Sequence, residues 1–270
     1  MPELPEVEIT RRGIEPFVLG KTVTGVTVRN PKLRRRVPRN LARIIVGQRV
    51  ERLRRRGKYI LFDFDAGSLI VHLGMSGSLR LIDAQSAPRK HDHVDLVFGG
   101  FALRLRDPRR FGMVLWGRGD TSRHPLLARL GVEPLSEAFT AEFLHRVTRG
   151  RDVGIKQLLM NAGVIVGVGN IYANESLFRA RIHPRARAGR LSRERCARLV
   201  EAVKETLVAA IAAGGSSLRD FVHSDGASGY FQQNYYVYDR AALPCRVCGA
   251  GIRVARLGQR SSFYCTTCQS

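Results

Sequence analysis

The sequence of 270 residues lacks any long apolar run, and none approaches the ~18 residues that would suggest a membrane-spanning helix. Its first residues also do not resemble a secretory leader, because the segment from Met1 to Glu8 is acidic where a leader is basic and then apolar. These two absences exclude an integral membrane protein and predict a chain that stays in the cytoplasm.

Acidic residues are scarce as well. There are 23 Asp and Glu residues against 45 Lys and Arg, and the formal net charge is +22. The basic residues are spread from Arg11 to Arg260 rather than gathered on one amphipathic helix, which favours nucleic acid over a membrane surface as the partner. Hydrophobic residues make up 44% of the chain, enough for real cores, and the length suits two domains.

The residue patterns divide the chain into a β half and an α half. After a short helix expected near Pro5 to Gly13, the segment from Lys21 to Gly117 is predicted to form the strands of a sandwich or barrel. It contains compact apolar runs at Tyr59–Phe64 and Leu69–Leu73 and an alternating run from Phe101 to Leu105. Past Leu130, helices are expected at Glu137 to Thr148, Ile155 to Ala162, Ile171 to Arg179 and Ser192 to Ala213, with a linker near Pro134.

Four of the five cysteines form two pairs, Cys245-Arg-Val-Cys248 and Cys265-Thr-Thr-Cys268, with sixteen residues between them. Four thiolates at this spacing suit a tetrahedral structural zinc held by a hairpin. Two disulfides are the alternative, but a cytoplasmic chain with an unpaired Cys196 argues against them. We expect one structural zinc ion, with no open position for catalysis, and Cys196 in a helix core.

The N-terminus offers chemistry that the zinc does not. If Met1 is removed, Pro2 becomes a secondary amine that can attack a sugar carbon, and Glu3 and Glu6 beside it are suited to proton transfer. The alternative is structural: a helix with Pro5 in its first turn and acidic residues at its positive end.

Read together, the two ends of the chain resemble the formamidopyrimidine-DNA glycosylase family. The resemblance continues nearly end to end through His72-Leu-Gly-Met-Ser-Gly-Ser78, Lys90-His-Asp-His-Val-Asp95, Asp107-Pro-Arg-Arg-Phe-Gly112, Gly167-Val-Gly-Asn-Ile-Tyr-Ala-Asn-Glu175 and Gln259-Arg260. Endonuclease VIII-type relatives usually begin Pro-Glu-Gly-Pro-Glu, so Leu4 favours the branch that acts on oxidised purines.

The resemblance implies a bifunctional glycosylase and lyase of base excision repair. The amine of Pro2 displaces the damaged base, Glu3 is the general acid, and the Schiff base leads to β- and then δ-elimination. Lys58 matches the family lysine near the lesion, although by charge alone it extends the solvated run 54–56. Arg260 matches the arginine of the zinc hairpin that binds phosphates beside the lesion and takes part in δ-elimination.

The family also implies residues that fill the gap left when the damaged nucleotide is turned out of the duplex. Met75, Arg109 and Phe111 match this role, with Arg109 facing the orphaned base. Phe111 taken alone suits a core equally well. An unpaired arginine is costly to bury, so the run from Asp107 to Phe111 is expected on an exposed loop.

Phosphate contacts are implied for Asn170, in a helix-two-turn-helix motif, and for Lys156, His91 and Arg151. The Gly-rich start of this motif offers backbone N–H groups and Asn170 as a capping side chain at a helix N-terminus. His91 and His93 could be metal ligands, but they lack further ligands at a recognisable spacing, so hydrogen bonding is expected.

The Gly- and Ser-rich stretch from Gly214 to Tyr230 matches the family loop that covers the extruded base, and a plain mobile connector is the alternative. Ser216 and Ser217 stand where family members often have threonines.

We therefore expect an α+β fold. Residues 1–133 form an N-terminal β-sandwich with an N-terminal helix, 134–240 a helical domain with the helix-two-turn-helix motif and the covering loop, and 241–270 a zinc ribbon. The chain is expected to be a monomer that binds damaged double-stranded DNA across the cleft between its halves, with no membrane partner. Two alternatives stay open: an endonuclease VIII-like enzyme for oxidised pyrimidines, and a zinc-ribbon protein that binds damaged DNA without catalysis.

Overall fold

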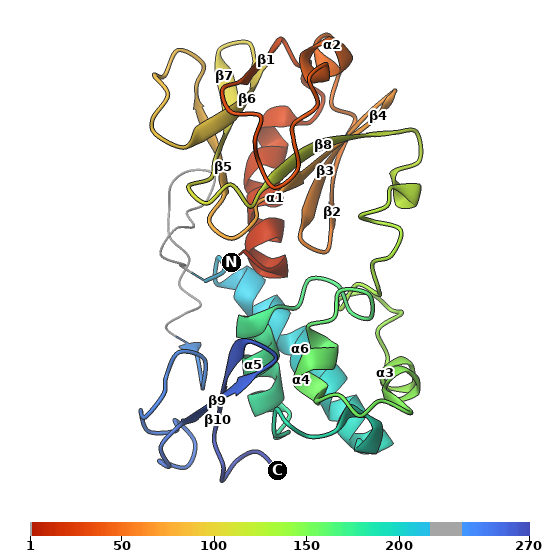
Figure 1. Ribbon diagram of the computed structural model, residues 1–270, viewed down its shortest axis with the longest axis vertical. Coiled ribbons are helices and arrows are strands. Elements are labelled where there is room, and N and C mark those ends of the chain that lie inside the picture. The colour runs from red at the N-terminus through yellow and green to blue at the C-terminus, as the bar shows by residue number, and fades with distance from the viewer. Residues whose placement is uncertain (1, 217–233) are drawn as a thin grey trace. The chain divides into compact units, whose positions relative to one another are not determined.

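The computed structural model describes residues 2–216 and 234–270, which form two compact units (Figure 1). The first unit holds residues 2–128 and 214–216, and the second holds 129–213 and 234–270. In these described ranges, no helix combines the length and the apolar character needed to cross a bilayer.

The chain opens with helix α1 (Leu4–Val18), which is longer than the predicted Pro5 to Gly13. Pro5 lies in the first turn, where its missing N–H costs nothing. The helix continues past Gly13 and contains Pro16, because its last turns carry Ile14 and Val18, which are fully buried in the core. Burial of such side chains contributes about 1.5–3 kcal/mol each, which offsets the cost of a glycine and of one lost hydrogen bond.

Two antiparallel four-stranded sheets make up most of the first unit. One has the order β1-β6-β7-β5 and the other β2-β3-β4-β8. Their bounds are β1 (Gly25–Val28), β2 (Arg52–Arg56), β3 (Tyr59–Phe64), β4 (Gly67–His72), β5 (Ser78–Asp83), β6 (Asp92–Phe98), β7 (Phe101–Arg106) and β8 (Met113–Arg118). The prediction for β3 matches at both ends, whereas the short helices α2 (Leu41–Ile45) and η1 (Thr121–Arg123) were not predicted.

One apolar core joins both sheets with α1 and α2. It takes alternate side chains from the strands, as a half-buried sheet requires, among them Phe62, Leu69, Leu103 and Val114. Val7 of α1 packs in the same cluster. The predicted β-sandwich with an N-terminal helix is confirmed.

The second unit is helical and ends in a hairpin. Its elements are α3 (Ala141–Thr148), α4 (Ile155–Leu159), α5 (Asn170–Arg179), η2 (Ala188–Arg190), α6 (Arg193–Ala212), β9 (Arg253–Leu257) and β10 (Arg260–Tyr264). Helix α6 follows the prediction to within one residue at each end, because Ser192 caps it by accepting a hydrogen bond from the N–H of Arg195. Cys196 is fully buried, as expected. In this unit α5 packs against both α6 and β10.

Candidate active site and metal centre

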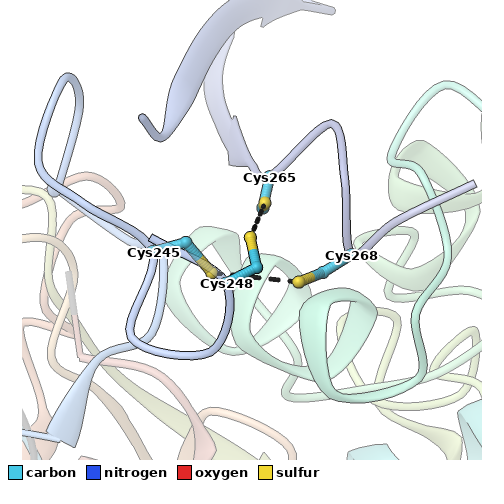
Figure 2. A group of neighbouring side chains, drawn as sticks. All are labelled: Cys245, Cys248, Cys265 and Cys268. Atoms are coloured by element: carbon cyan, nitrogen blue, oxygen red, sulfur yellow. Dashed lines mark hydrogen bonds between the residues drawn. The ribbon is translucent and has the colours of Figure 1, made fainter. Parts of the chain in front are cut away.

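The four paired cysteines come together at the ends of the β9–β10 hairpin, and their side chains point toward one another (Figure 2). The sulfur atoms of Cys248 and Cys265 are 3.4 Å apart, those of Cys245 and Cys268 are 3.9 Å apart, and all four lie within 4.8 Å of one another. A tetrahedral zinc with Zn–S bonds of about 2.3 Å requires sulfur separations of about 3.8 Å. The donor set therefore fits one structural zinc ion, and the described residues contain no second group able to hold a metal.

The hairpin presents Arg260 at its tip. Gly258 and Gln259 connect β9 to β10 with φ values of +51° and +62°, the left-handed pair that a two-residue hairpin turn requires. Arg260 pairs with Leu257 across the hairpin, and its side chain is exposed. A Cβ at position 258 would lie 2.8 Å from the side-chain nitrogen of Gln157, so the turn packs closely on the residues of α4.

Lys156 lies under this hairpin rather than on an open surface. Only 1% of it is exposed, and its Nζ donates to the carbonyl oxygen of Ser261 and the hydroxyl of Ser262, each at 2.7 Å. From α5, the side-chain oxygen of Asn174 accepts a hydrogen bond of 2.9 Å from the N–H of Phe263. The ammonium that was expected on a phosphate thus holds the zinc hairpin against the helices.

Two other residues of the second unit, Asn170 and Arg151, are expected to bind phosphate. Helix α5 begins with Asn170 as its first helical residue, and Gly169 is the N-cap. The expectation that Asn170 caps with its side chain is therefore wrong, although the residue does stand at the helix N-terminus, half-buried. Arg151 is exposed in the connection between α3 and α4, and its backbone bonds to Thr148 and Gly189 fix the position.

At the N-terminus, Pro2 and Glu3 are buried at the start of α1. The carboxylate of Glu6 accepts the N–H of Glu3 at 2.8 Å through one oxygen and the N–H of Ser216 at 2.9 Å through the other. Glu6 is therefore a structural clamp between the N-terminus and the segment that begins at Gly214, which leaves Glu3 as the candidate acid. The expected covering loop beyond Ser216, with Ser217, lies outside the described residues.

Lys58 stands in the two-residue turn between β2 and β3, where Gly57 adopts a φ of +56°. It is half-buried, and its charge acts on His72. Burial, followed by the charges of Lys58 and Arg34, lowers the pKa of His72 to about 4, so the imidazole is neutral at neutral pH. Its Nδ1 accepts the N–H of Gly74 at 2.9 Å. The charges of Lys58 and Arg34 thus act on a half-buried histidine that opens the motif from His72 to Ser78, whereas Arg34 stands in none of the motifs quoted above.

One buried carboxylate connects the two loops that carry the expected gap-filling residues. Asp107 is fully buried and accepts the hydroxyl of Ser76 at 2.9 Å and the N–H of Gly112 at 2.7 Å. The hydroxyl of Ser76 also accepts the N–H of Arg109 at 3.3 Å. A Cβ at Gly74 would lie 2.5 Å from the backbone of residues 111 and 112, so the loops touch directly.

The side chains on these loops reach outward. Phe111 is 41% exposed, and the guanidinium of Arg109 lies 5.0 Å from the centroid of its ring, at cation–π distance. Met75 is half-buried on the neighbouring turn. Residues 108–111 are exposed, as expected, and the core interpretation of Phe111 is wrong. Asp107, expected on the same exposed loop, is instead fully buried, because its carboxylate accepts hydrogen bonds from Ser76 and Gly112. Arg109 and Phe111 are thus brought together, and the turn that carries Met75 lies directly against their loop.

The ring of His93 makes a hydrogen bond, as expected, whereas His91 is held through its backbone. His93 is buried with its Nε2 2.8 Å from the carbonyl oxygen of Asp107, and the carbonyl of His91 accepts the N–H of Asp107 at 3.0 Å. His91 itself is half-buried, with a φ of +77°.

Comparisons with known proteins cover the whole chain. Family models match as the formamidopyrimidine-DNA glycosylase N-terminal domain over residues 1–114, the H2TH domain of the same proteins over 130–222, and the zinc finger found in FPG and IleRS over 242–270. The formamidopyrimidine-DNA glycosylase of Aromatoleum aromaticum is 62% identical, with 100% of this chain and 99% of that protein covered.

Two solved structures show the same fold. The crystal structure of the MutM (FPG) protein of Thermus thermophilus is 41% identical with a TM-score of 0.89, covering 99% of this chain and 98% of that one. The Lactococcus lactis FPG (MutM) in complex with DNA containing Fapy-dG is 31% identical with a TM-score of 0.91, covering 99% of both chains.

Proposed function

We propose, because the chain belongs to the formamidopyrimidine-DNA glycosylase family, that it is a DNA glycosylase of base excision repair that removes oxidised purines and then cuts the strand as a lyase. The observation that carries this proposal is the buried Pro2-Glu3 start, clamped by Glu6 in the same unit as the braced loops of Met75 and Arg109. The substrates are formamidopyrimidines and 8-oxoguanine in double-stranded DNA. The protein acts as a monomer, in the bacterial cytoplasm and on nucleoid DNA.

In the proposed reaction, Pro2 supplies the electron pair. Its secondary amine, freed by removal of Met1, bonds to the sugar carbon that carries the damaged base, and the base leaves with a proton from Glu3. Opening of the sugar ring produces an iminium ion between the proline nitrogen and that carbon. Loss of a sugar proton then expels the 3′ phosphate by β-elimination, and a second loss expels the 5′ phosphate by δ-elimination.

The remaining residues position the strand. Lys58 lies near the reacting sugar, and Arg260, presented by the hairpin, binds the phosphates beside the lesion and assists δ-elimination. Met75, Arg109 and Phe111 occupy the space of the flipped nucleotide. His91, Arg151 and Asn170 bind backbone phosphates, and Lys156 contributes by seating the hairpin that carries Arg260. The zinc ion has a structural role, since four cysteines complete its coordination.

Borohydride reduction tests the central step. Reduction of the iminium should fix a covalent protein–DNA complex on a duplex with 8-oxoguanine, and peptide mapping should place the DNA on Pro2. Protein that retains Met1 should not be trapped. Cleavage by an authentic Pro2 terminus without any trapping, or trapping on Lys58 alone, would show that the nucleophile is assigned wrongly.

Binding and cleavage of two matched duplexes, one with an oxidised purine and one with an oxidised pyrimidine, separate the alternatives. An endonuclease VIII-like enzyme would cleave a matched duplex with an oxidised pyrimidine faster than one with an oxidised purine. A damage-binding protein without catalysis would bind both duplexes and cut neither.

A further inference from the structure

A cavity of about 550 Å³ lies in the first unit against the strands β5 and β7 and the loop before β6. Its lining includes four arginines, Arg80, Arg89, Arg104 and Arg106, and one carboxylate, Asp92. We call it the arginine cavity. It belongs to none of the sites described above.

The strand register places these arginines together. In β7, Leu103 and Leu105 point into the core, so Arg104 and Arg106 lie on the opposite face of the sheet. Arg80 of β5 is the direct cross-strand partner of Arg104. Like charges directly opposite each other destabilise a sheet, so this pairing needs compensation.

Arg104 is compensated and gives the cavity a fixed wall. Its guanidinium is buried and donates to both oxygens of Asp95, at 2.9 and 2.8 Å. It also donates to the carbonyl oxygens of Ser86 at 3.0 Å and Ala87 at 3.2 Å. The loop that walls the cavity is thus held in one conformation by a buried side chain.

The other three arginines are not compensated in this way. Within residues 2–216 and 234–270, no salt bridge involves Arg80, Arg89 or Arg106, and Arg80 donates only to the hydroxyl of Ser78, at 3.2 Å. Burial, and then the charges of Arg106 and Arg89 against the opposing charge of Asp92, lowers the pKa of Arg80. These three guanidinium groups share the cavity with a single carboxylate, Asp92, so its lining keeps a net positive charge that a bound anion would offset.

We propose that the arginine cavity binds a phosphate group, and that in the working enzyme this group is a phosphodiester of the DNA. Guanidinium forks match phosphate oxygens in two-point hydrogen bonds. The cavity adjoins the proposed DNA site, because Arg106 directly precedes Asp107, which braces the loop of Arg109, and because Asp92 directly follows His91. The choice of DNA as the source of the phosphate rests on the proposed function. It adds a backbone contact to those implied by the family resemblance.

Salt dependence of duplex binding tests the site. Each phosphate contact that is lost should reduce the slope of log K against log salt by about 1. With a duplex that carries a stable tetrahydrofuran abasic analogue, we expect the double variant Arg80→Gln/Arg106→Gln to reduce the slope by about 2. Arg43→Gln, which removes an exposed charge of α2 outside the cavity, serves as the control and should leave the slope within about 0.3 of wild type. A double variant with the slope of the control would overturn the proposal.

Three further measurements keep the outcomes distinct. Inorganic pyrophosphate binding that the double variant abolishes, with an unchanged duplex slope, would identify a site for free phosphate and overturn the DNA assignment. Trp116 fluorescence shows whether the double variant folds. If it does not, Arg89→Glu, a change on the exposed loop of the cavity, should still weaken duplex binding. Borohydride trapping should survive in the Arg43→Gln control, and failure of wild type to trap would count against the proposed function alone.

Discussion

Replacing Asp107 with alanine should loosen both loops of the proposed lesion-reading site. The carboxylate is fully buried, and its loss leaves the hydroxyl of Ser76 and the N–H of Gly112 without their acceptor. An unsatisfied buried donor costs about 1–3 kcal/mol, so the two together predict a loss of roughly 2–6 kcal/mol from the first unit. Asp107→Asn should lose less, because its amide can accept from Gly112 and donate to the hydroxyl of Ser76.

Trp116, the only tryptophan of the chain, lies in β8 and reports on the first unit alone. Urea unfolding followed by its fluorescence should show a midpoint lower by about 1–3 M for Asp107→Ala, with a slope m of about 2 kcal/mol/M. Asp120→Ala is the matched control, because Asp120 makes the same two kinds of hydrogen bond to Ser122 on an exposed loop and should matter much less. Equal midpoints for the two variants would refute the brace, as would an unchanged preference for the base opposite the lesion.

Four further outcomes follow from the site. Glu3→Gln should lower base excision by about 10²- to 10⁴-fold, the range for a positioned proton donor, while duplex binding persists; parallel excision and binding assays check this. Cys245→Ser, or chelation, should disorder the zinc hairpin and weaken DNA binding while Trp116 fluorescence stays native, and full binding by zinc-free protein would contradict it. Arg109→Ala should reduce cleavage selectively when cytosine faces the lesion, because cytosine offers acceptors to a donor-only guanidinium, and an equal loss opposite adenine would indicate a mere phosphate contact. The pKa of His72 is about 4 in the folded protein, below its unfolded value of about 6.5. Its contribution to stability is therefore full above about pH 6.5 and is lost as the pH falls toward 4, by at most about 3 kcal/mol. His72→Gln should flatten that part of the curve of unfolding free energy against pH.

The sequence was informative wherever a local pattern decides the structure. Helix α6 was predicted to within one residue at each end because a single apolar stripe and a serine cap define it, and β3 because its apolar run ends in a turn on both sides. Helix α1 was predicted too short, since the burial of Val18 that outweighs Pro16 depends on the sheets. Helix α2 was missed because five residues carry too little periodicity.

For the site, the family motifs supplied residue types but not their partners. Asp107 and Ser76 are separated by 31 positions, and no local pattern in either segment predicts their hydrogen bond. Lys156 has a partner 105 positions away, so the sequence could not predict the hydrogen bonds that hold it under the zinc hairpin, and its contact with phosphate stays a prediction. Such contacts arise from tertiary packing, whereas the CxxC spacing carries its own geometry and predicted the metal centre directly.

In the two loops that carry Met75, Arg109 and Phe111, the contacts that hold the backbone are separate from the side chains proposed to contact DNA. Asp107, Ser76 and the two close glycines, Gly74 and Gly112, hold the backbone of these loops together with His93, whose Nε2 lies 2.8 Å from the carbonyl oxygen of Asp107. The side chains at 75, 109 and 111 project from that backbone and can be exchanged without rebuilding it. Under the proposed function, an engineer who wishes to change which opposing base the enzyme accepts should therefore diversify positions 75, 109 and 111 as one set and leave the supporting backbone contacts intact.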